Sequence, residues 1–384
     1  MTQTTLFDRD TPLYIESASG VLPKFPARRW KRWLLRFGFF LIFAAVAVWF
    51  EIASDGQQTA TANAELAARI ADLRLGAGIE PIEALHPLIT GILASVIPGG
   101  AFGLSIAGCV VGAFLVQLIV QSLERKAVPR PLAVALVVTL SLTPMFFYIV
   151  TTNFQAVLSL TFFGFAMIAL LRFTTFANTQ AGFRAGLLLA LAAFSDTTAA
   201  FAVLVVAAAS LVLVQSRQRA RLANALVIAY PTVAFYAAFA ALGVAFRVGP
   251  FAMLGGAPAW SQSNADTLLS ALATPAGALY YSPTVVIALA AGVLGYLWLG
   301  LVGVLLTVST TLAYLLGYAP PGTAGNSFVM SLLFAIALIQ RPRTRPHAWI
   351  LGGTALLLLC IGWVSAFGRP TILTWMSTLT GGAL

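Results

Sequence analysis

Few side chains in this sequence could do chemistry, and two of them stand together at the end of an apolar segment. Asp55 directly follows the first long apolar run, and Glu51 lies one helical turn before it. A carboxylate at such a place could act as a general base or a metal ligand at the rim of a membrane cavity. Asp55 could equally cap the turn that follows it, and Glu51 could simply reach the membrane surface.

Three more polar residues are candidates for substrate contacts, and each has a structural alternative. His86 precedes Pro87 at the start of a short apolar piece, where a hydrogen-bonded structural role is the alternative. Asp196 is the only acid between residues 185 and 215, in a Ser-Asp-Thr-Thr run that is also typical of a helix cap. Arg247 could bind a phosphate with two hydrogen bonds or contact a lipid headgroup.

The composition requires most of the chain to avoid water. Of its 384 residues, 60% are apolar and only 9% are charged, whereas a soluble domain has about 25% charged residues. These percentages exclude a soluble enzyme, a disordered chain and a nucleic-acid-binding module, despite the net charge of +10. Cys109 and Cys360 lie inside apolar runs, which favours packing roles over a disulfide or a redox motif.

The basic residues indicate how the chain crosses a membrane. Eighteen of the 22 Lys and Arg residues fall into five groups, at 9–36, 125–130, 172–184, 217–221 and 341–345. Because Lys and Arg favour cytoplasmic loops, we expect an all-α polytopic membrane protein with a cytoplasmic N-terminus and about 11 transmembrane helices. The expected helical segments are 33–53, 99–123, 131–150, 155–172, a hairpin over 185–215, 222–245, a hairpin over 281–318 split near Gly295, 328–340 and 348–367.

The first outer loop, residues 54–98, is predicted to contain structure of its own. Leu66, Ile70 and Leu73 recur at helical spacing within 61–76, which predicts an amphipathic helix lying along the membrane face. A second short apolar piece follows at its end. The chain thus divides into a cytoplasmic basic tail (1–32), a membrane module (33–216) and C-terminal membrane helices (217–384).

The order of these features resembles the GT-C superfamily of integral-membrane glycosyltransferases, in the branch of bacterial protein mannosyltransferases and lipid A sugar transferases. The resemblance covers about residues 33–216. Its motifs are Asp55, the amphipathic stretch 61–76, His86-Pro87, the long helix 99–123, Leu142-Thr143-Pro144, and Gly186-Leu187-Leu188 through Ser195-Asp196-Thr197-Thr198.

The resemblance implies a transferase of the bacterial inner membrane that moves a sugar from a polyprenyl-phosphate donor to a glycan or lipid acceptor. Asp55 would be the catalytic base, with a divalent metal as a candidate cofactor, and Arg247 would neutralise the departing phosphate. Glu51, His86 and Asp196 would contact the substrates.

Two other functions stay open. The chain has Gly56 and Asn153 where the family often has acids, so a non-catalytic scaffold for surface-polysaccharide assembly is one alternative. The other is a lipid or solute transporter, which would place ionisable residues at mid-helix depth.

Overall fold

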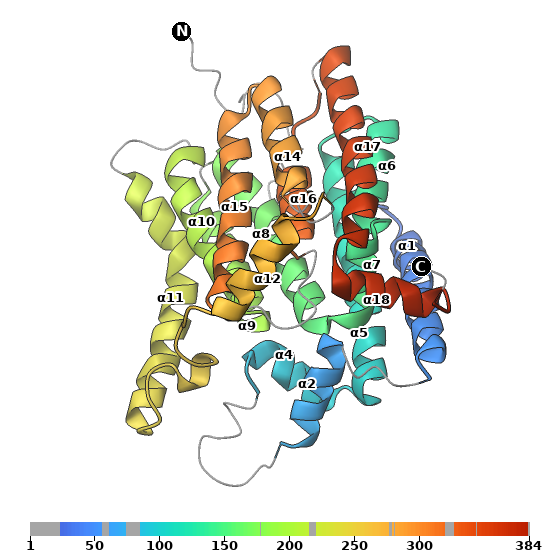
Figure 1. Cartoon of the computed structure of the whole chain (residues 1–384). Coiled ribbons are helices and arrows are strands. Elements are labelled where there is room, and N and C mark those ends of the chain that lie inside the picture. Colours follow the sequence, from blue (N-terminus) through green and yellow to red (C-terminus); the bar gives the residue numbers. More distant parts are fainter. Residues whose placement is uncertain are drawn as a thin grey trace.

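The chain is helical throughout the part that the structure, a computed structural model, describes (Figure 1). That part comprises residues 24–55, 61–73, 85–176, 178–214, 220–275, 279, 281–318, 326–342 and 344–382. No strand occurs among these residues. The expectation of an all-helical protein is therefore confirmed.

Six helices in the described residues are long and apolar enough to cross a membrane. They are α1 (Arg29–Ala53), α5 (Gly100–Arg125), α8 (Phe154–Phe176), α11 (Arg221–Ala245), α15 (Leu297–Leu315) and α17 (Arg345–Phe367). The helices α6 (Arg130–Ser141) and α7 (Pro144–Thr152) are bent by 54° at their junction and would make a seventh span if they cross as one. The protein is thus a multi-pass membrane protein.

Shorter helices complete the molecule. They are α2 (Ala62–Ala71), α4 (Leu88–Val96), α9 (Thr179–Ser195), α10 (Thr198–Leu213), η2 (Ala252–Leu254), α12 (Gln262–Leu272), α14 (Ser282–Val293), α16 (Asn326–Leu338) and α18 (Pro370–Leu379). The predicted apolar segments are helical, and both expected hairpins break where predicted, between α9 and α10 and around Gly295. The single helix expected over 131–150 is instead broken into α6 and α7, where Pro144 begins a new helix. The number of eleven crossings and the sidedness of the ends stay predictions, because only six or seven spans meet the length that a bilayer requires.

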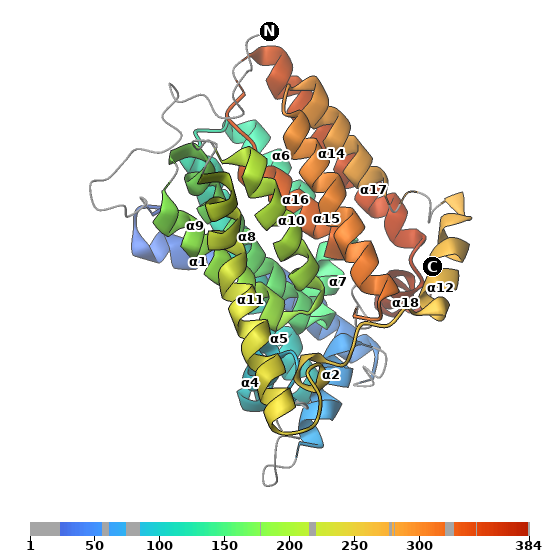
Figure 2. The same ribbon diagram turned by 90° about the vertical axis from the view of Figure 1, so that its left-hand side faces the viewer.

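Burial divides the helices into a centre and a periphery. In α8, 89% of the most apolar 18-residue stretch is buried, against 17% in α1 and in α11. The neighbours of α8 are α5, α9 and α16, and Figures 1 and 2 show α8 between them. A helix that is apolar on all sides packs inside a helical body, whereas the exposed apolar faces of α1 and α11 suit lipid contact.

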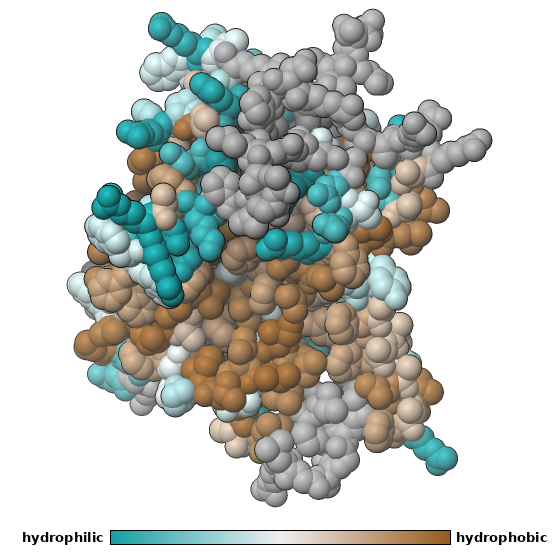
Figure 3. Space-filling view, turned by 180° about the vertical axis from the view of Figure 1, so that it is seen from behind, coloured by the Kyte–Doolittle hydropathy of each residue, from teal (hydrophilic) through white to brown (hydrophobic). Residues whose placement is uncertain are grey.

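The two ends of the helical body differ in charge. One end, called here the basic end, carries cations that include Arg29, Arg125, Arg172, Arg184 and Arg341. In Figure 3 hydrophilic side chains gather over the upper part of the molecule, above a broad apolar band. At the opposite end, α2 packs against α5, and α4 packs against α2 and α9 (Figures 1 and 2).

The amphipathic helix predicted within 61–76 forms as α2, and its position along a membrane face stays a prediction. Thr61 begins it by accepting a hydrogen bond from Ala64 N at 3.2 Å, and Leu66 is buried while Glu65 is exposed. The helix ends at Ala71, and residues 74–76 of the predicted range lie outside the described part. The short apolar piece after His86 forms α4.

Candidate functional site

The helix α1 presents Glu51 and Asp55 at its C-terminal end. Glu51 is half-buried in the last turn, where its backbone oxygen accepts a hydrogen bond from Ser54 Oγ at 3.2 Å. Asp55 is exposed and has a φ of +49°, a left-handed conformation that Asp tolerates better than most residues. A carboxylate there faces the negative end of the helix dipole, so the helix itself does not stabilise its charge. The turn that Asp55 could cap, 56–60, lies outside the described residues.

An apolar groove of about 850 Å³ lies between α1 and α18 and stops just short of Asp55. On α1 it extends from Leu41 to Ala53, and on the other side from Thr378 to Gly381. Neither Asp55 nor Glu51 is among the residues that line it. The groove can accept a hydrocarbon chain whose polar end would emerge near Asp55.

His86 connects α4 to the segment after α11. Its imidazole is half-buried and lies directly on the backbone of Gly255, because a Cβ at that glycine would stand 2.9 Å from Nε2 of His86. Gly255 has a φ of +83°, so the position is suited to glycine on two grounds. His86 therefore packs between the start of α4 and the turn that follows η2.

Arg247 lies in this same segment, two residues beyond the end of α11. Its side chain is exposed, and its backbone has a φ of +60° with its N–H bonded to Val244 O at 3.0 Å. Because η2 and Gly255 follow it closely, Arg247 and His86 belong to neighbouring parts of one end of the molecule.

Asp196 is fully buried between α9 and α10. Its Oδ1 accepts hydrogen bonds from the backbone N–H of Thr198 at 3.0 Å and from Thr198 Oγ1 at 2.7 Å. One carboxylate oxygen, Oδ1, therefore caps the start of α10, which is the structural role that the sequence offered for Asp196. Gln155 interacts with the carboxylate, yet Oδ2 has no well-formed hydrogen bond within the described residues.

Asp196 belongs to a layer of buried polar side chains that we call the polar layer: Asn63, Ser105, Asn153, Gln155, Asp196, Thr198 and Asn326. Asn326 Nδ2 donates to Thr198 Oγ1 at 3.4 Å, which brings the start of α16 to the α9–α10 break. Asn63 Nδ2 donates to Ser105 Oγ at 3.0 Å, and its Oδ1 accepts from Phe154 N at 2.7 Å. The polar layer therefore joins α2 and α5 to the start of α8 and to the break between α9 and α10.

A second contact ties α4 to this layer. Thr90 Oγ1 donates to the backbone oxygen of Ser195 at 2.7 Å, and Thr90 is fully buried. On the far side, Phe194 stacks against Tyr236 of α11 with ring centroids 5.2 Å apart. The α9–α10 break is thus held by α4 and by α11.

The structure unites some of the sequence-predicted residues and leaves others apart. His86, Arg247 and Asp196 stand on elements that meet around α4, whereas Glu51 and Asp55 stand at the end of α1. None of the five lines the groove between α1 and α18, and none lines the cation-rich cavity near the start of α1. Sequence reasoning missed Asn63 and Asn326, since an asparagine inside a helical pattern carries no local signal for burial.

The family resemblance makes a divalent metal ion a candidate cofactor. Among the described residues, no three His, Cys, Asp or Glu side chains come close enough together to hold one. Glu80 and Glu83 of the first loop lie outside these residues.

These features define the class of protein: an all-helical, multi-pass membrane protein with a polar layer where its broken helices meet. Neither a family model, nor a curated protein, nor a solved structure matches this chain.

Proposed function

We propose that this protein is a GT-C-type membrane glycosyltransferase of the bacterial inner membrane. It takes a sugar from a polyprenyl-phosphate donor and passes it to a glycan or lipid acceptor at the α2–α4 end. In this proposal the basic end faces the cytoplasm, because Lys and Arg are retained on that side. The bent pair α6–α7 crosses as one span, and the shorter helices α9, α10, α14 and α16 complete eleven crossings.

The observation that carries the proposal is the apolar groove along α1, whose last lining residue on that helix, Ala53, is two positions before Asp55. A polyprenyl chain needs an apolar path that delivers its phosphate to the membrane surface next to a general base. The groove between α1 and α18 offers such a path. The helices α2 and α4 pack against each other at the same end of the molecule and form what we call the α2–α4 shelf (Figure 1).

The reaction is a displacement at the anomeric carbon. Asp55 accepts the proton of the acceptor hydroxyl as its oxygen bonds to that carbon, and the bond from the carbon to the donor phosphate oxygen breaks. The electron pair leaves with the phosphate, and Arg247 neutralises the added charge. Asp55 and Arg247 are both exposed and follow different helices, so in this proposal the bound substrate bridges them, and His86, Glu51 and Asp196 shape the site.

Replacement of Asp55 tests this mechanism. Asp55→Asn should lower the rate of polyprenyl-phosphate release by about 100-fold or more, the range in which positioned bases contribute. The assay uses the full chain in liposomes supplied with polyprenyl-phosphate sugar. Asp72→Asn is the matched control, because Asp72 is another exposed acid at the same end, on the C-cap of α2. Equal rates for both variants would refute the role of Asp55, and an inactive wild-type chain would favour the scaffold.

Lipid transport is the second candidate, and the buried Asp196 favours it. Discontinuous helices with a polar group at their junction are typical of transporter substrate sites, and Asp196 stands at such a junction. The same liposomes separate the two functions, because a transporter moves the labelled donor lipid across the bilayer without releasing polyprenyl phosphate.

A further inference from the structure

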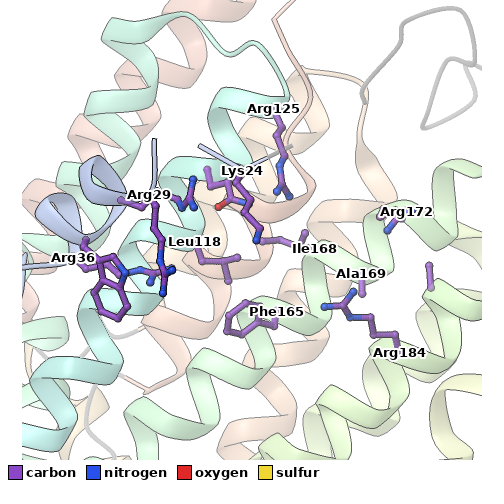
Figure 4. Close-up of a pocket in the computed structure, with 14 residues that line it drawn as sticks. Lys24, Arg29, Arg36, Leu118, Arg125, Phe165, Ile168, Ala169, Arg172 and Arg184 are labelled. Carbon is purple, nitrogen blue, oxygen red and sulfur yellow. The ribbon is translucent and has the colours of Figure 1, made fainter. Parts of the chain in front are cut away.

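The basic end contains a pocket of about 700 Å³ whose wall is rich in cations (Figure 4). One lysine and six arginines line it: Lys24, Arg29, Arg32, Arg36, Arg125, Arg172 and Arg184. They come from the start of α1, the end of α5, the end of α8 and α9, and in Figure 4 the labelled cations surround a common space. No acid is among the described residues that line it.

Two of these cations are fixed by neighbouring groups. Arg36 donates through Nε and Nη2 to Gln117 Oε1, at 3.0 and 2.8 Å, and its guanidinium lies 4.2 Å from the ring centroid of Phe114. Arg32 donates to the backbone oxygens of Pro26 and Ala27, each at 2.7 Å. Their positions are therefore set before any ligand arrives, which lowers the entropy cost of binding.

The pocket also has an apolar wall. Leu118 lies on α5, and Phe165, Ile168 and Ala169 lie on α8. Trp33 adds an aromatic ring next to Arg36, of the kind that stands at membrane surfaces. A free ion would use only the cationic part, whereas a lipid would use both parts.

Like charges held around one cavity repel each other, so such a pocket is stabilised by an anion with several negative charges. The uncapped N-terminus of α1, which begins at Arg29, adds to the positive potential. Basic pockets between membrane helices suit lipid headgroups of high negative charge.

We propose that this pocket binds a group bearing two phosphates, presented by an anionic membrane lipid such as diphosphatidylglycerol. The site is independent of the proposed sugar transfer, because it lies at the opposite end from Asp55 and the α2–α4 shelf. Arg36 and Arg32 fix one phosphate, Arg172 and Arg184 hold the other, and the acyl chains lie against the apolar wall.

The binding test uses the full chain in detergent and counts bound lipid by native mass spectrometry. We expect diphosphatidylglycerol to bind about tenfold more tightly than phosphatidylglycerol, which carries one phosphate. The double variant Arg172→Gln/Arg184→Gln should bind about 30-fold more weakly, since each cation near a membrane surface contributes roughly a fivefold factor. The matched control Arg341→Gln/Arg345→Gln removes the same charge from the same end outside the pocket, where both residues are exposed.

Three results would overturn the proposal. These are equal affinity for the lipids with one and two phosphates, an equal loss of binding in the control, and displacement of the lipid by inorganic pyrophosphate at the lipid's own concentration. The last result would assign the pocket to a soluble diphosphate. If the double variant misfolds, Lys24→Gln repeats the test, with a loss of about fivefold expected.

Discussion

At the residue scale, Asn63 is fully buried, and its amide side chain makes hydrogen bonds to two other helices, α5 and α8. It belongs to α2, donates to Ser105 on α5, and accepts from the first N–H of α8. That N–H is one of the donors that a helix leaves unpaired at its start. Asn63 therefore caps the start of α8, although it belongs to a different helix.

Asn63→Ala should reduce the free energy of unfolding by about 1–3 kcal/mol, because a buried donor is left unsatisfied. Chemical unfolding in detergent micelles measures the change. Asn264→Ala is the control, since Asn264 is only half-buried and its Nδ2 makes one bond, to Tyr314 O at 2.8 Å. A larger loss in the control would contradict the importance assigned to Asn63.

Lys126 gives the protein a predicted dependence of stability on pH. It follows α5 and is buried, and its Nζ donates to the backbone oxygens of Ile336 and Ala337. Burial lowers the pKa of Lys126 to about 7, from 10.5. Between these two values the unfolded chain binds a proton that the folded chain does not, so stability should rise as the pH rises from 7 toward 10.

Lys126→Met should remove this part of the pH dependence, while Lys31→Met should keep it because Lys31 is exposed. The measurement is the thermal midpoint in detergent at several pH values between 7 and 10. Parallel curves for the wild type and Lys126→Met would show that another group is responsible.

At the scale of elements, breaks between helices are the feature that organises the molecule. The bend between α6 and α7, the junction of α7 with α8 at Asn153, and the junction of α9 with α10 at Asp196 all release backbone groups. Inside a bilayer these groups need internal partners, and the polar layer supplies several of them. Small residues then allow the segments to approach closely.

Gly108 is such a residue on α5, where it faces α7. A Cβ at this position would lie only 2.4 Å from the backbone oxygen of Val150. Gly108→Ala should therefore destabilise the fold by about 1–3 kcal/mol, the usual cost of overpacking, as measured by unfolding in detergent. Gly352→Ala is the control, because nothing lies within 4 Å of a Cβ there. Equal stability of the two variants would show that α5 and α7 can move apart without cost.

At the scale of the whole molecule, the separation of charge between the two ends predicts how the protein sits in its membrane. In a Cys360→Ser background, Ala68→Cys on α2 should react with an impermeant maleimide on intact cells. Arg341→Cys should react only after the membrane is opened. Both positions are exposed, and Cys109 is buried. The reverse pattern would invert the topology and place the proposed transfer site in the cytoplasm.

Sequence patterns located most of the fold because membrane helices are determined locally. Apolar length and flanking cations identified the cores of α1, α5, α8, α11 and α17, and Ser195-Asp196-Thr197-Thr198 identified a real break. The same patterns did not foresee α12 and α18, which are short and only partly apolar. They also treated 131–150 as one helix, whereas the structure breaks it into α6 and α7, which are bent by 54°.

For the candidate site, the sequence could not say which of the chosen residues would meet in space. His86 contacts Gly255, more than 160 positions away along the chain, and Asp196 meets Asn326 through Thr198. Asp55 and Asp196 both follow an apolar run in the sequence, yet Asp55 is exposed and Asp196 is fully buried.

By itself, the sequence determined that this protein is helical, membrane-embedded and charged unequally at its two ends, because apolar length and charge act on each segment separately. Only the tertiary structure decided that four segments pool their cations in one pocket and that helix breaks gather in one polar layer. Such meetings depend on how side chains of distant helices interlock, and no local pattern records that packing.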